Sequence, residues 1–369
     1  MTQPFVDPLE ALRPLFEGSR ALLQADKLRR GYLLSALLPK PPVGATPSEL
    51  VHRQGKLELR YYAPPAQSDA APEGAAPALR VPVIVVPSMI NRAYIVDLEP
   101  DRSLVAGLAQ KGHPVYLVDW GVPTEEDATH DVGTVLLDLL HRAVDRACRH
   151  AGQPSAFLLG YCQGGTLAAM YTALRPARVH GLAVFNAPVK FSESGRFRQF
   201  VDAACFDVDA SIAPDRLVPT EIMTVGFKLL DPMGSALKYV AIDEVSARPR
   251  ELLRTLARER WLDENVPMPG AFAREFIRYA YQEDRLLAGT WVVRGETVDL
   301  RNIRCPLMVL AAKKDFIAPA PAVMPLATAT SSADVHAEVL DTGHIGVVVG
   351  SYGPRTFYPL LDRWFRAHP

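Results

Sequence analysis

Short apolar runs alternate with stretches of helical spacing along most of this sequence. The runs are nearly continuous in valine, isoleucine, leucine and alanine, and they begin at Val81, Val115, Ala156, Leu182, Leu307 and Val335. Continuous apolar strands that are separated by helices are typical of a parallel sheet with helices on both faces. The sequence therefore predicts an α/β fold with a parallel central sheet.

A long interruption separates the fourth of these strands from the fifth. Residues 187–305 far exceed an ordinary connection between strand and helix, and their text is mostly helical, as in residues 250–261 and 271–287. We therefore expect residues 81–186 and 306–369 to form the core, with 187–305 as an inserted, mostly helical cap subdomain above the sheet.

The residues before this core have a different character. Residues 5–38 carry leucines at helical spacing, and Pro14 and Gly31 are expected to break them into separate helices. Residues 63–80 are rich in alanine and proline, which is typical of an exposed loop. We expect residues 1–80 to contain helices, a strand and this loop. The helices either pack on the flank of the domain or provide a docking surface for a partner.

Charge and cysteine content exclude several classes of protein. The 40 Lys and Arg residues balance 41 Asp and Glu residues, so no net charge favours nucleic acid or an anionic membrane. Charged residues or prolines interrupt every apolar run before it could span a membrane, and the N-terminus lacks a signal-peptide pattern. The cysteines lack the paired spacing of a zinc site. We expect a cytoplasmic protein with reduced thiols, no transmembrane segment and no metal.

The strand that begins at Ala156 runs directly into the motif G-Y-C-Q-G, residues 160–164, and a helical pattern follows. This is the nucleophile-elbow pattern, with Cys162 in place of the usual serine. Glycines permit the sharp turn that lifts the nucleophile above the sheet, and the helix dipole favours a thiolate there. We predict that Cys162 is a covalent nucleophile. The alternative is a buried structural cysteine in a glycine-rich turn.

A thiol nucleophile needs a base, and the base needs an acid that orients it. In the α/β-hydrolase order the acid and then a histidine follow the nucleophile, each in a loop after a strand. The fifth strand leads to Asp315 and the sixth to His344. We predict that Cys162, Asp315 and His344 form a triad on an α/β-hydrolase fold. Asp341 is the alternative acid, although its place on the same loop as the histidine favours a role in the turn.

Backbone N–H groups are expected to stabilise the oxyanion that forms during acyl transfer. Gln163 begins the helix after the nucleophile, so its N–H is the first candidate. The second donor should come from the loop after the first core strand, where Met89 or Ile90 is the candidate.

A cysteine at this position suits acyl transfer. Moving an acyl group from one thioester to another thiol is close to isoenergetic, so an acyl-cysteine keeps the potential to acylate a hydroxyl. The elbow therefore indicates transfer onto an alcohol at least as much as hydrolysis.

Several ordered motifs extend from about residue 80 to the C-terminus. They cover residues 86–105, 115–121, 159–167, 299–303, 314–319 and 342–346. In these motifs the sequence resembles polyhydroxyalkanoate (PHA) synthases, and specifically the short forms that work with a second subunit. The resemblance implies an α/β-hydrolase core with a cap, Cys162 as the nucleophile, His344 as the general base and Asp315 as the acid.

The resemblance also implies a reaction and partners. In such enzymes an (R)-3-hydroxyacyl-CoA, here expected to be 3-hydroxybutyryl-CoA, acylates the cysteine and CoA leaves. The hydroxyl of one unit then attacks the thioester of another, so that a polyester chain grows. The CoA thioester is the substrate, and no separate cofactor is expected. A homodimer, a second synthase subunit and a location at the surface of polymer granules are further expectations.

Two other functions remain open at this point. One is a cysteine thioesterase or PHA depolymerase on the same scaffold, and the other is a non-catalytic subunit that binds granules. The complete set of Cys162, Asp315 and His344 argues against the non-catalytic subunit. Many family members have a histidine directly after the catalytic aspartate, whereas this sequence has Phe316.

Overall fold

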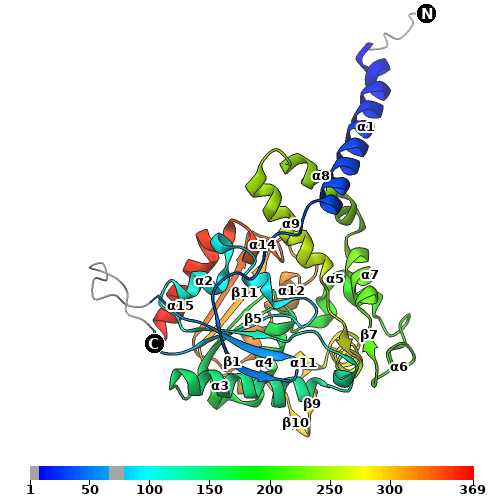
Figure 1. Ribbon diagram of the computed structural model, residues 1–369. Coiled ribbons are helices and arrows are strands. Elements are labelled where there is room, and N and C mark those ends of the chain that lie inside the picture. Colours follow the sequence, from blue (N-terminus) through cyan, green and yellow to red (C-terminus); the bar gives the residue numbers. More distant parts are fainter. Residues whose placement is uncertain (1–7, 66–78) are drawn as a thin grey trace, which may run out of the picture. The chain divides into compact units, whose positions relative to one another are not determined.

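The computed structural model describes residues 8–65 and 79–369. The chain divides into two compact units, which are described separately below (Figure 1). The larger unit contains residues 43–225 and 261–369, and the smaller unit contains residues 1–42 and 226–260. Residues 5–7 of the predicted helical stretch and residues 66–78 of the predicted loop lie outside the described residues.

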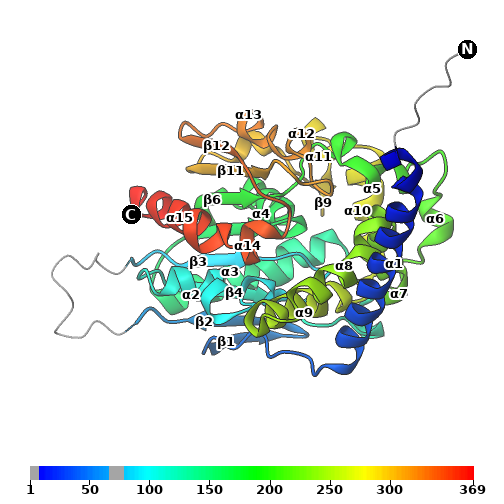
Figure 2. The same ribbon diagram turned by 90° about the horizontal axis from the view of Figure 1, so that it is seen from above.

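An eight-stranded sheet forms the centre of the larger unit, in the order β1-β2-β4-β3-β5-β6-β11-β12 (Figure 2). The six strands from β4 to β12 in this order pair in parallel, and β1 and β2 are antiparallel additions at one edge. The strands are β1 (Glu49–Gln54), β2 (Leu57–Tyr62), β3 (Val83–Val86), β4 (Val115–Asp119), β5 (Ala156–Tyr161), β6 (Val179–Phe185), β11 (Leu307–Ala312) and β12 (Val335–Leu340).

This sheet confirms the six predicted strands and their parallel arrangement, but the predicted start of the regular core was wrong. The sheet already begins at Glu49, because β2 pairs with β4. Leu57, Leu59 and Tyr62 are buried, while charged residues alternate with them. Such alternation is typical of an antiparallel edge strand with one face on the core, and it lacks the continuous apolar run used to find the other strands.

Helices cover both faces of the sheet, as Figure 1 shows. On one face lie α3 (His141–Ala151) and α4 (Gln163–Leu174), and on the other lie α2 (Leu104–Ala109) and α15 (Tyr358–Ala367). Every residue of α4 is buried, which explains why this helix is apolar on all sides. In the part of the chain that the structure describes, no helix is long and apolar enough to cross a membrane.

The remaining elements of the larger unit are short. Before the fourth parallel strand they are η1 (Ala93–Val96), η2 (Pro100–Arg102), η3 (Glu125–Asp127), the π-helix η4 (Thr134–Leu140) and η5 (Pro176–Arg178). After the fifth they are α12 (Ala320–Val323), α13 (Leu326–Ala329), α14 (Gly346–Val349) and the π-helix η9 (Gly353–Phe357).

Residues 187–305 are mostly helical, as expected, and their contacts divide them between the two units. Residues 226–260 belong to the smaller unit, and the other residues of the insertion belong to the larger one. That the whole insertion acts as a cap stays a prediction. Its helices are η6 (Phe191–Glu193), α5 (Gly195–Phe200), α6 (Val208–Ser211), α7 (Thr220–Leu230), α8 (Pro232–Val245), α9 (Pro249–Asp263), α10 (Gly270–Phe276), the π-helix η7 (Ile277–Gln282), α11 (Arg285–Ala288) and η8 (Leu300–Asn302). Its strands are β7 (Leu217–Val218), β8 (Met268–Pro269), β9 (Val292–Val293) and β10 (Glu296–Thr297).

The smaller unit is built on α1 (Pro8–Leu37), which packs against α8. The predicted breaks at Pro14 and Gly31 were wrong, because the helix is continuous over 30 residues. At Gly31 the absence of a side chain serves contact between helices, since a Cβ atom there would lie only 1.7 Å from the carbonyl oxygen of Tyr239. A proline inside a helix removes one backbone hydrogen bond, and α1 accommodates that loss.

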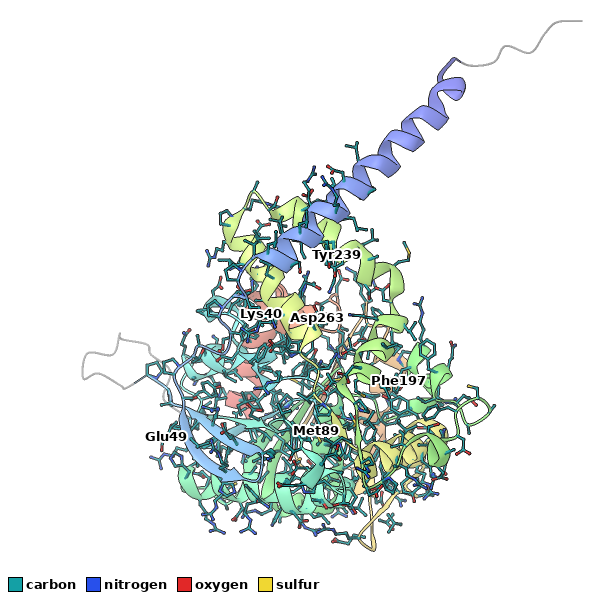
Figure 3. All side chains as sticks on the ribbon, turned by 45° about the vertical axis from the view of Figure 1, so that its right-hand side comes forward. Lys40, Glu49, Met89, Phe197, Tyr239 and Asp263 are labelled. Carbon is teal, nitrogen blue, oxygen red and sulfur yellow. The ribbon has the colours of Figure 1, made fainter. Side chains whose placement is uncertain are left out.

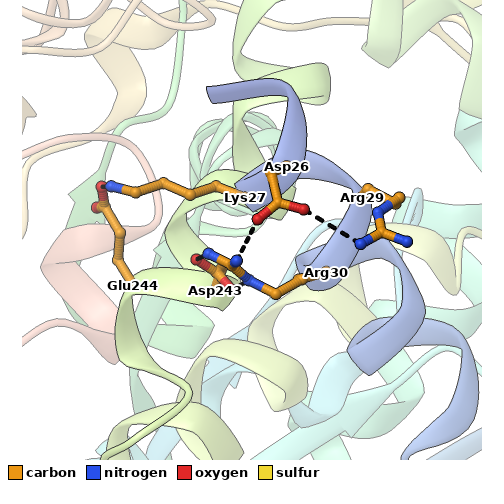
Figure 4. Close-up of polar contacts among 6 residues, drawn as sticks. All are labelled: Asp26, Lys27, Arg29, Arg30, Asp243 and Glu244. Carbon is orange, nitrogen blue, oxygen red and sulfur yellow. Dashed lines mark hydrogen bonds and ion pairs between the residues drawn. The ribbon is translucent and has the colours of Figure 1, made fainter. Parts of the chain in front are cut away.

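Ion pairs at the surface of the smaller unit join α1 to α8 (Figure 4). The Arg30 guanidinium donates to both carboxylate oxygens of Asp243, with Nε–Oδ1 at 2.8 Å and a terminal nitrogen at 3.0 Å from Oδ2. Lys27 Nζ lies 2.8 Å from a carboxylate oxygen of Glu244. Arg30 also pairs with Asp26 one turn before it on α1.

Candidate active site

Cys162 lies between the end of β5 and the start of α4, at the top of the sheet. Its φ of 55° and ψ of −134° belong to a region that side chains rarely adopt, and such strain is typical of a nucleophile elbow. The glycine after it is required by close packing. A Cβ atom on Gly164 would lie 2.2 Å from the carbonyl oxygen of Val86 and 2.3 Å from that of Pro87. The predicted elbow therefore has the backbone geometry that the motif indicates.

His344 and Asp315 lie together, as the sequence predicted. The distance between His344 Nδ1 and Asp315 Oδ2 is 2.6 Å, and the two side chains are 9% and 0% exposed. The other carboxylate oxygen of Asp315 accepts the backbone N–H groups of Ile317 at 2.8 Å and Ala318 at 2.9 Å. The carboxylate is thus fixed on one side by its own loop and presents its second oxygen to the imidazole.

The electrostatic surroundings of His344 favour its protonated form. Burial by itself lowers the pKa of His344, but the negative charges of Asp315 and Cys162 and hydrogen bonds to both side chains raise it to about 10. The imidazole is hydrogen-bonded to the acid through Nδ1, and the Cys162 side chain contributes to the same pKa shift. An imidazole in this position can hold the proton of the thiol as an imidazolium and later give it to a leaving group.

Two further side chains hold the backbone of His344, and the sequence analysis did not find them. Asn186 Nδ2 donates to the carbonyl oxygen of His344 at 2.9 Å, and the hydroxyl of Tyr161 donates to the same oxygen at 3.2 Å. Asn186 follows β6 directly and has a φ of 51°, a conformation that asparagine tolerates better than most residues. The sequence feature that could have indicated this role is an asparagine directly after a core strand.

The predicted oxyanion donors are backbone N–H groups at the elbow and in the loop after β3. The two N–H groups of the loop already donate hydrogen bonds to oxygen atoms of the protein. The N–H of Met89 donates to the side-chain amide oxygen of Gln163 at 3.2 Å, and the N–H of Ile90 donates to Ser88 Oγ at 3.1 Å. Met89 is buried in the larger unit (Figure 3). The oxyanion roles of Gln163, Met89 and Ile90 stay predictions.

The loop that carries Met89 is anchored at several points. Trp120 Nε1 donates to the carbonyl oxygen of Pro87 at 2.9 Å, and the N–H of Val266 donates to that of Ile90 at 2.9 Å. The first turn of α4 packs directly on the same loop through Gly164. Little freedom remains for the backbone of this loop.

Aromatic side chains from the insertion form a cluster around Tyr281. Tyr281 lies on η7, and its ring centroid is 4.8 Å from those of Phe191 and Phe197. Burial raises the pKa of the Tyr281 hydroxyl, and Cys162 adds to this shift. This aromatic group is an apolar cluster within the insertion.

The other sequence candidates lie elsewhere. Asp341, the alternative acid, is exposed and pairs with Lys314 at 3.0 Å, which lowers the pKa of that carboxyl. Burial raises the pKa of the Cys305 thiol to about 11 and also raises that of Cys148. Among the residues that the structure describes, no group of His, Cys, Asp and Glu side chains is arranged to hold a metal ion.

The fold is that of an α/β-hydrolase, with a cysteine at the elbow where the nucleophile is predicted. Residues 81–351 match the family model of the alpha/beta hydrolase fold, and residues 41–108 match that of the poly-beta-hydroxybutyrate polymerase (PhaC) N-terminus. Among solved structures, BpoC of Mycobacterium tuberculosis is similar in fold, with a TM-score of 0.50, 13% identity, and coverage of 86% of this chain and 100% of BpoC.

Curated relatives narrow this class to one family. The chain is 31% identical over 359 residues to the poly(3-hydroxyalkanoate) polymerase subunit PhaC of Allochromatium vinosum, covering 96% of this chain and 95% of the relative. It is 31% identical to that of Synechocystis, covering 87% and 85%. It is 32% identical to that of Haloferax mediterranei, covering 88% of this chain and 64% of the relative. The chain is therefore an enzyme of the poly(3-hydroxyalkanoate) polymerase family, which confirms the resemblance found in its sequence.

Proposed function

We propose that this chain polymerises (R)-3-hydroxyacyl-CoA into polyhydroxyalkanoate and releases CoA, with the growing chain held as a thioester on Cys162. The observation that carries the proposal is the cysteine elbow beside the buried His344–Asp315 pair, with 2.6 Å between the imidazole and the carboxylate. Family membership supports the acyl-CoA substrate and the polyester product. We expect 3-hydroxybutyryl-CoA as the substrate.

The first step is acylation of the cysteine. His344 takes the proton of the Cys162 thiol, and the sulfur attacks the thioester carbonyl of the acyl-CoA. The tetrahedral intermediate collapses, the bond between the carbonyl carbon and the CoA sulfur breaks, and the imidazolium protonates the departing sulfur. One thioester replaces another, so the acyl group keeps its transfer potential. CoA is a leaving group, and the reaction needs no separate cofactor.

The second step lengthens the polymer. The 3-hydroxyl of one acyl unit attacks the thioester carbonyl of another, and His344 accepts the hydroxyl proton. An ester bond forms, the bond from carbon to the cysteine sulfur breaks, and the proton returns to the thiolate. Asp315 keeps the imidazole in the required orientation throughout, because the other oxygen of its carboxylate is held by its own loop.

The proposal includes partners and a place. The aromatic group around Tyr281 suits a growing aliphatic ester, which needs an apolar surface that limits water. The chain is proposed to work at the surface of polymer granules, as a homodimer and with a second synthase subunit. Size measurement by light scattering, with and without substrate, tests the dimer.

The experiment that tests the proposal follows two products together. Purified protein is mixed with (R)-3-hydroxybutyryl-CoA, and free CoA and insoluble polymer are measured over time. Release of CoA with polymer supports the synthase. CoA with only soluble hydroxyacid would indicate a thioesterase, and the absence of CoA release would indicate a non-catalytic subunit. A Cys162→Ala variant serves as the control.

A further inference from the structure

The hydrogen bond between the Gln163 side chain and the Met89 backbone lies directly beside Cys162. Gln163 is the first residue of α4, directly after the nucleophile, and its side chain reaches the backbone N–H of Met89 at 3.2 Å. Both residues are buried. The oxygen of a carboxamide thus binds one of the N–H groups that are predicted to stabilise the oxyanion in the proposed reaction.

We propose that the side-chain amide oxygen of Gln163 occupies the Met89 N–H until substrate arrives, and that the substrate carbonyl oxygen displaces it during acylation. We call the glutamine oxygen a placeholder in this sense. This inference rests on the proposed function and deepens it, because it says how the oxyanion site is kept before substrate arrives. A buried N–H without a partner is costly, so a placeholder stabilises the empty site.

The rigidity of the surroundings identifies which partner moves. The loop backbone is held by Trp120 through the carbonyl oxygen of Pro87 and by Val266 through that of Ile90. Gly164 packs against the same loop with no room for a methyl group. The Gln163 side chain has rotatable bonds, whereas the Met89 N–H is fixed by its loop. Exchange of oxygens at this N–H therefore requires only that the glutamine side chain swing away.

The chemistry of the two oxygens explains what the placeholder selects. An amide oxygen is a stronger hydrogen-bond acceptor than the oxygen of a neutral thioester, whereas a tetrahedral oxyanion is stronger than both. Displacement becomes favourable as negative charge develops on the substrate oxygen. The placeholder stabilises the free enzyme, so its displacement adds to the barrier between free enzyme and transition state, and kcat/KM is lower than it would be with an open Met89 N–H.

The test compares two substitutions that should act in opposite directions. Gln163→Met keeps the length and removes the acceptor, so the Met89 N–H is open to substrate. The kcat/KM for acylation should then rise about two- to tenfold, the range expected for one intramolecular hydrogen bond. Gln163→Glu places a carboxylate on the same N–H and repels the oxyanion, so kcat/KM should fall at least about tenfold. Gln110→Met at the exposed end of α2 is the matched control and should change nothing.

Alkylation by iodoacetamide separates the oxyanion site from the thiol. This reagent reacts with Cys162 by displacement at carbon, and no oxyanion forms. Its rate should be equal in wild type and Gln163→Met, whereas acylation rates should differ. The acyl donors are 3-hydroxybutyryl-CoA and p-nitrophenyl butyrate, a generic ester that reports acylation through p-nitrophenol release.

Each outcome decides between the proposals. A rise for Gln163→Met with a fall for Gln163→Glu supports the placeholder. A fall in both would mean that Gln163 positions the loop, and no change in either would make it a spectator, so both results overturn the inference. Gln163→Asn, which is too short to reach Met89, replaces the methionine variant if that does not fold. Wild type that accepts the p-nitrophenyl ester but not the CoA thioester would contradict the proposed function and still test Gln163.

Discussion

One ion pair in each unit of this protein shows how different the surroundings of such pairs are. In the larger unit the His344–Asp315 pair of the candidate active site is 9% and 0% exposed. In the smaller unit Arg30 and Asp26 are 49% and 41% exposed and lie on a helix surface. Buried pairs are expensive to break, whereas exposed pairs contribute little to stability. The comparison teaches that a buried pair and the surface pairs between α1 and α8 should differ in what their loss costs, and that close packing is expected to contribute more than these surface pairs to the smaller unit.

The largest effect is expected at Cys162. Replacement by alanine should lower CoA release at least about a thousandfold and abolish the covalent acyl adduct, because an essential nucleophile has no substitute. Cys162→Ser should also be badly impaired, since an oxygen ester holds less transfer potential. Mass spectrometry of the intact protein after substrate addition measures the adduct. A variant that keeps more than about a tenth of the wild-type rate would remove Cys162 from the mechanism.

The next effect separates the two partners of the nucleophile. Asp315→Asn should slow elongation about a hundredfold and acylation less, because the imidazole keeps a hydrogen-bond partner but loses the charge that supports its protonated form. His344→Gln should suppress the first acylation itself. Rapid-quench measurement of the first CoA released against later CoA distinguishes the steps. Equal losses of both steps in both variants would contradict this division.

Matched glycine substitutions compare the packing of the two units. Gly164→Ala should destabilise the protein by about 3 kcal/mol or more, because its Cβ atom would overlap two carbonyl oxygens of the core. Gly31→Ala should also lower stability, since it forces α1 away from α8, but it should leave the alkylation rate of Cys162 unchanged. Urea unfolding and iodoacetamide labelling provide the two measurements.

Gly226→Ala is the control for this pair. Gly226 lies in α7, where a new Cβ atom would have no atom within 4 Å. Alanine there should be neutral or stabilising by up to about 1 kcal/mol through its higher helix propensity. If Gly226→Ala lowers the free energy of unfolding as much as Gly164→Ala does, close packing is not the cause of the destabilisation.

Much of the arrangement of the candidate active site could be predicted from sequence because its parts follow local patterns. The elbow at Cys162 and the loops after β11 and β12 each carry a strand and a motif in one continuous stretch. A parallel sheet brings the carboxyl ends of its strands to one edge, so Asp315 and His344 had to lie near the nucleophile once the order of elements was known.

Features that depend on distant residues could not be predicted in this way. The contact of Gly31 with Tyr239 turns an expected helix break into a packing site, and the partner is far away in the sequence. The bond from Asn186 to the His344 carbonyl oxygen likewise joins separate loops. The backbone N–H of Gln163 was predicted as an oxyanion donor. Its sequence position does not indicate that its side chain reaches Met89.

A smaller effect concerns pH. The pKa of His344 is raised from 6.5 to about 10 in the folded protein, so its protonated form stabilises the fold. That contribution is complete below pH 6.5, declines as the pH rises and is lost above about 10. The difference in unfolding free energy between wild type and His344→Gln should therefore shrink between pH 6.5 and 10. Urea unfolding across this range measures it, and a constant difference would contradict the raised pKa.

The smallest effect on stability is expected at Arg30. This variant tests most directly whether surface ion pairs contribute little to the smaller unit. Arg30→Ala removes contacts with Asp26 and Asp243, which are both partly open to solvent. Exposed ion pairs gain little, because water and salt screen them, so Tm should change by no more than about 2 °C. CoA release should equal that of wild type. A Tm loss as large as that of Gly31→Ala would mean that ion pairs, and not the close approach of α1 to Tyr239, hold the smaller unit together.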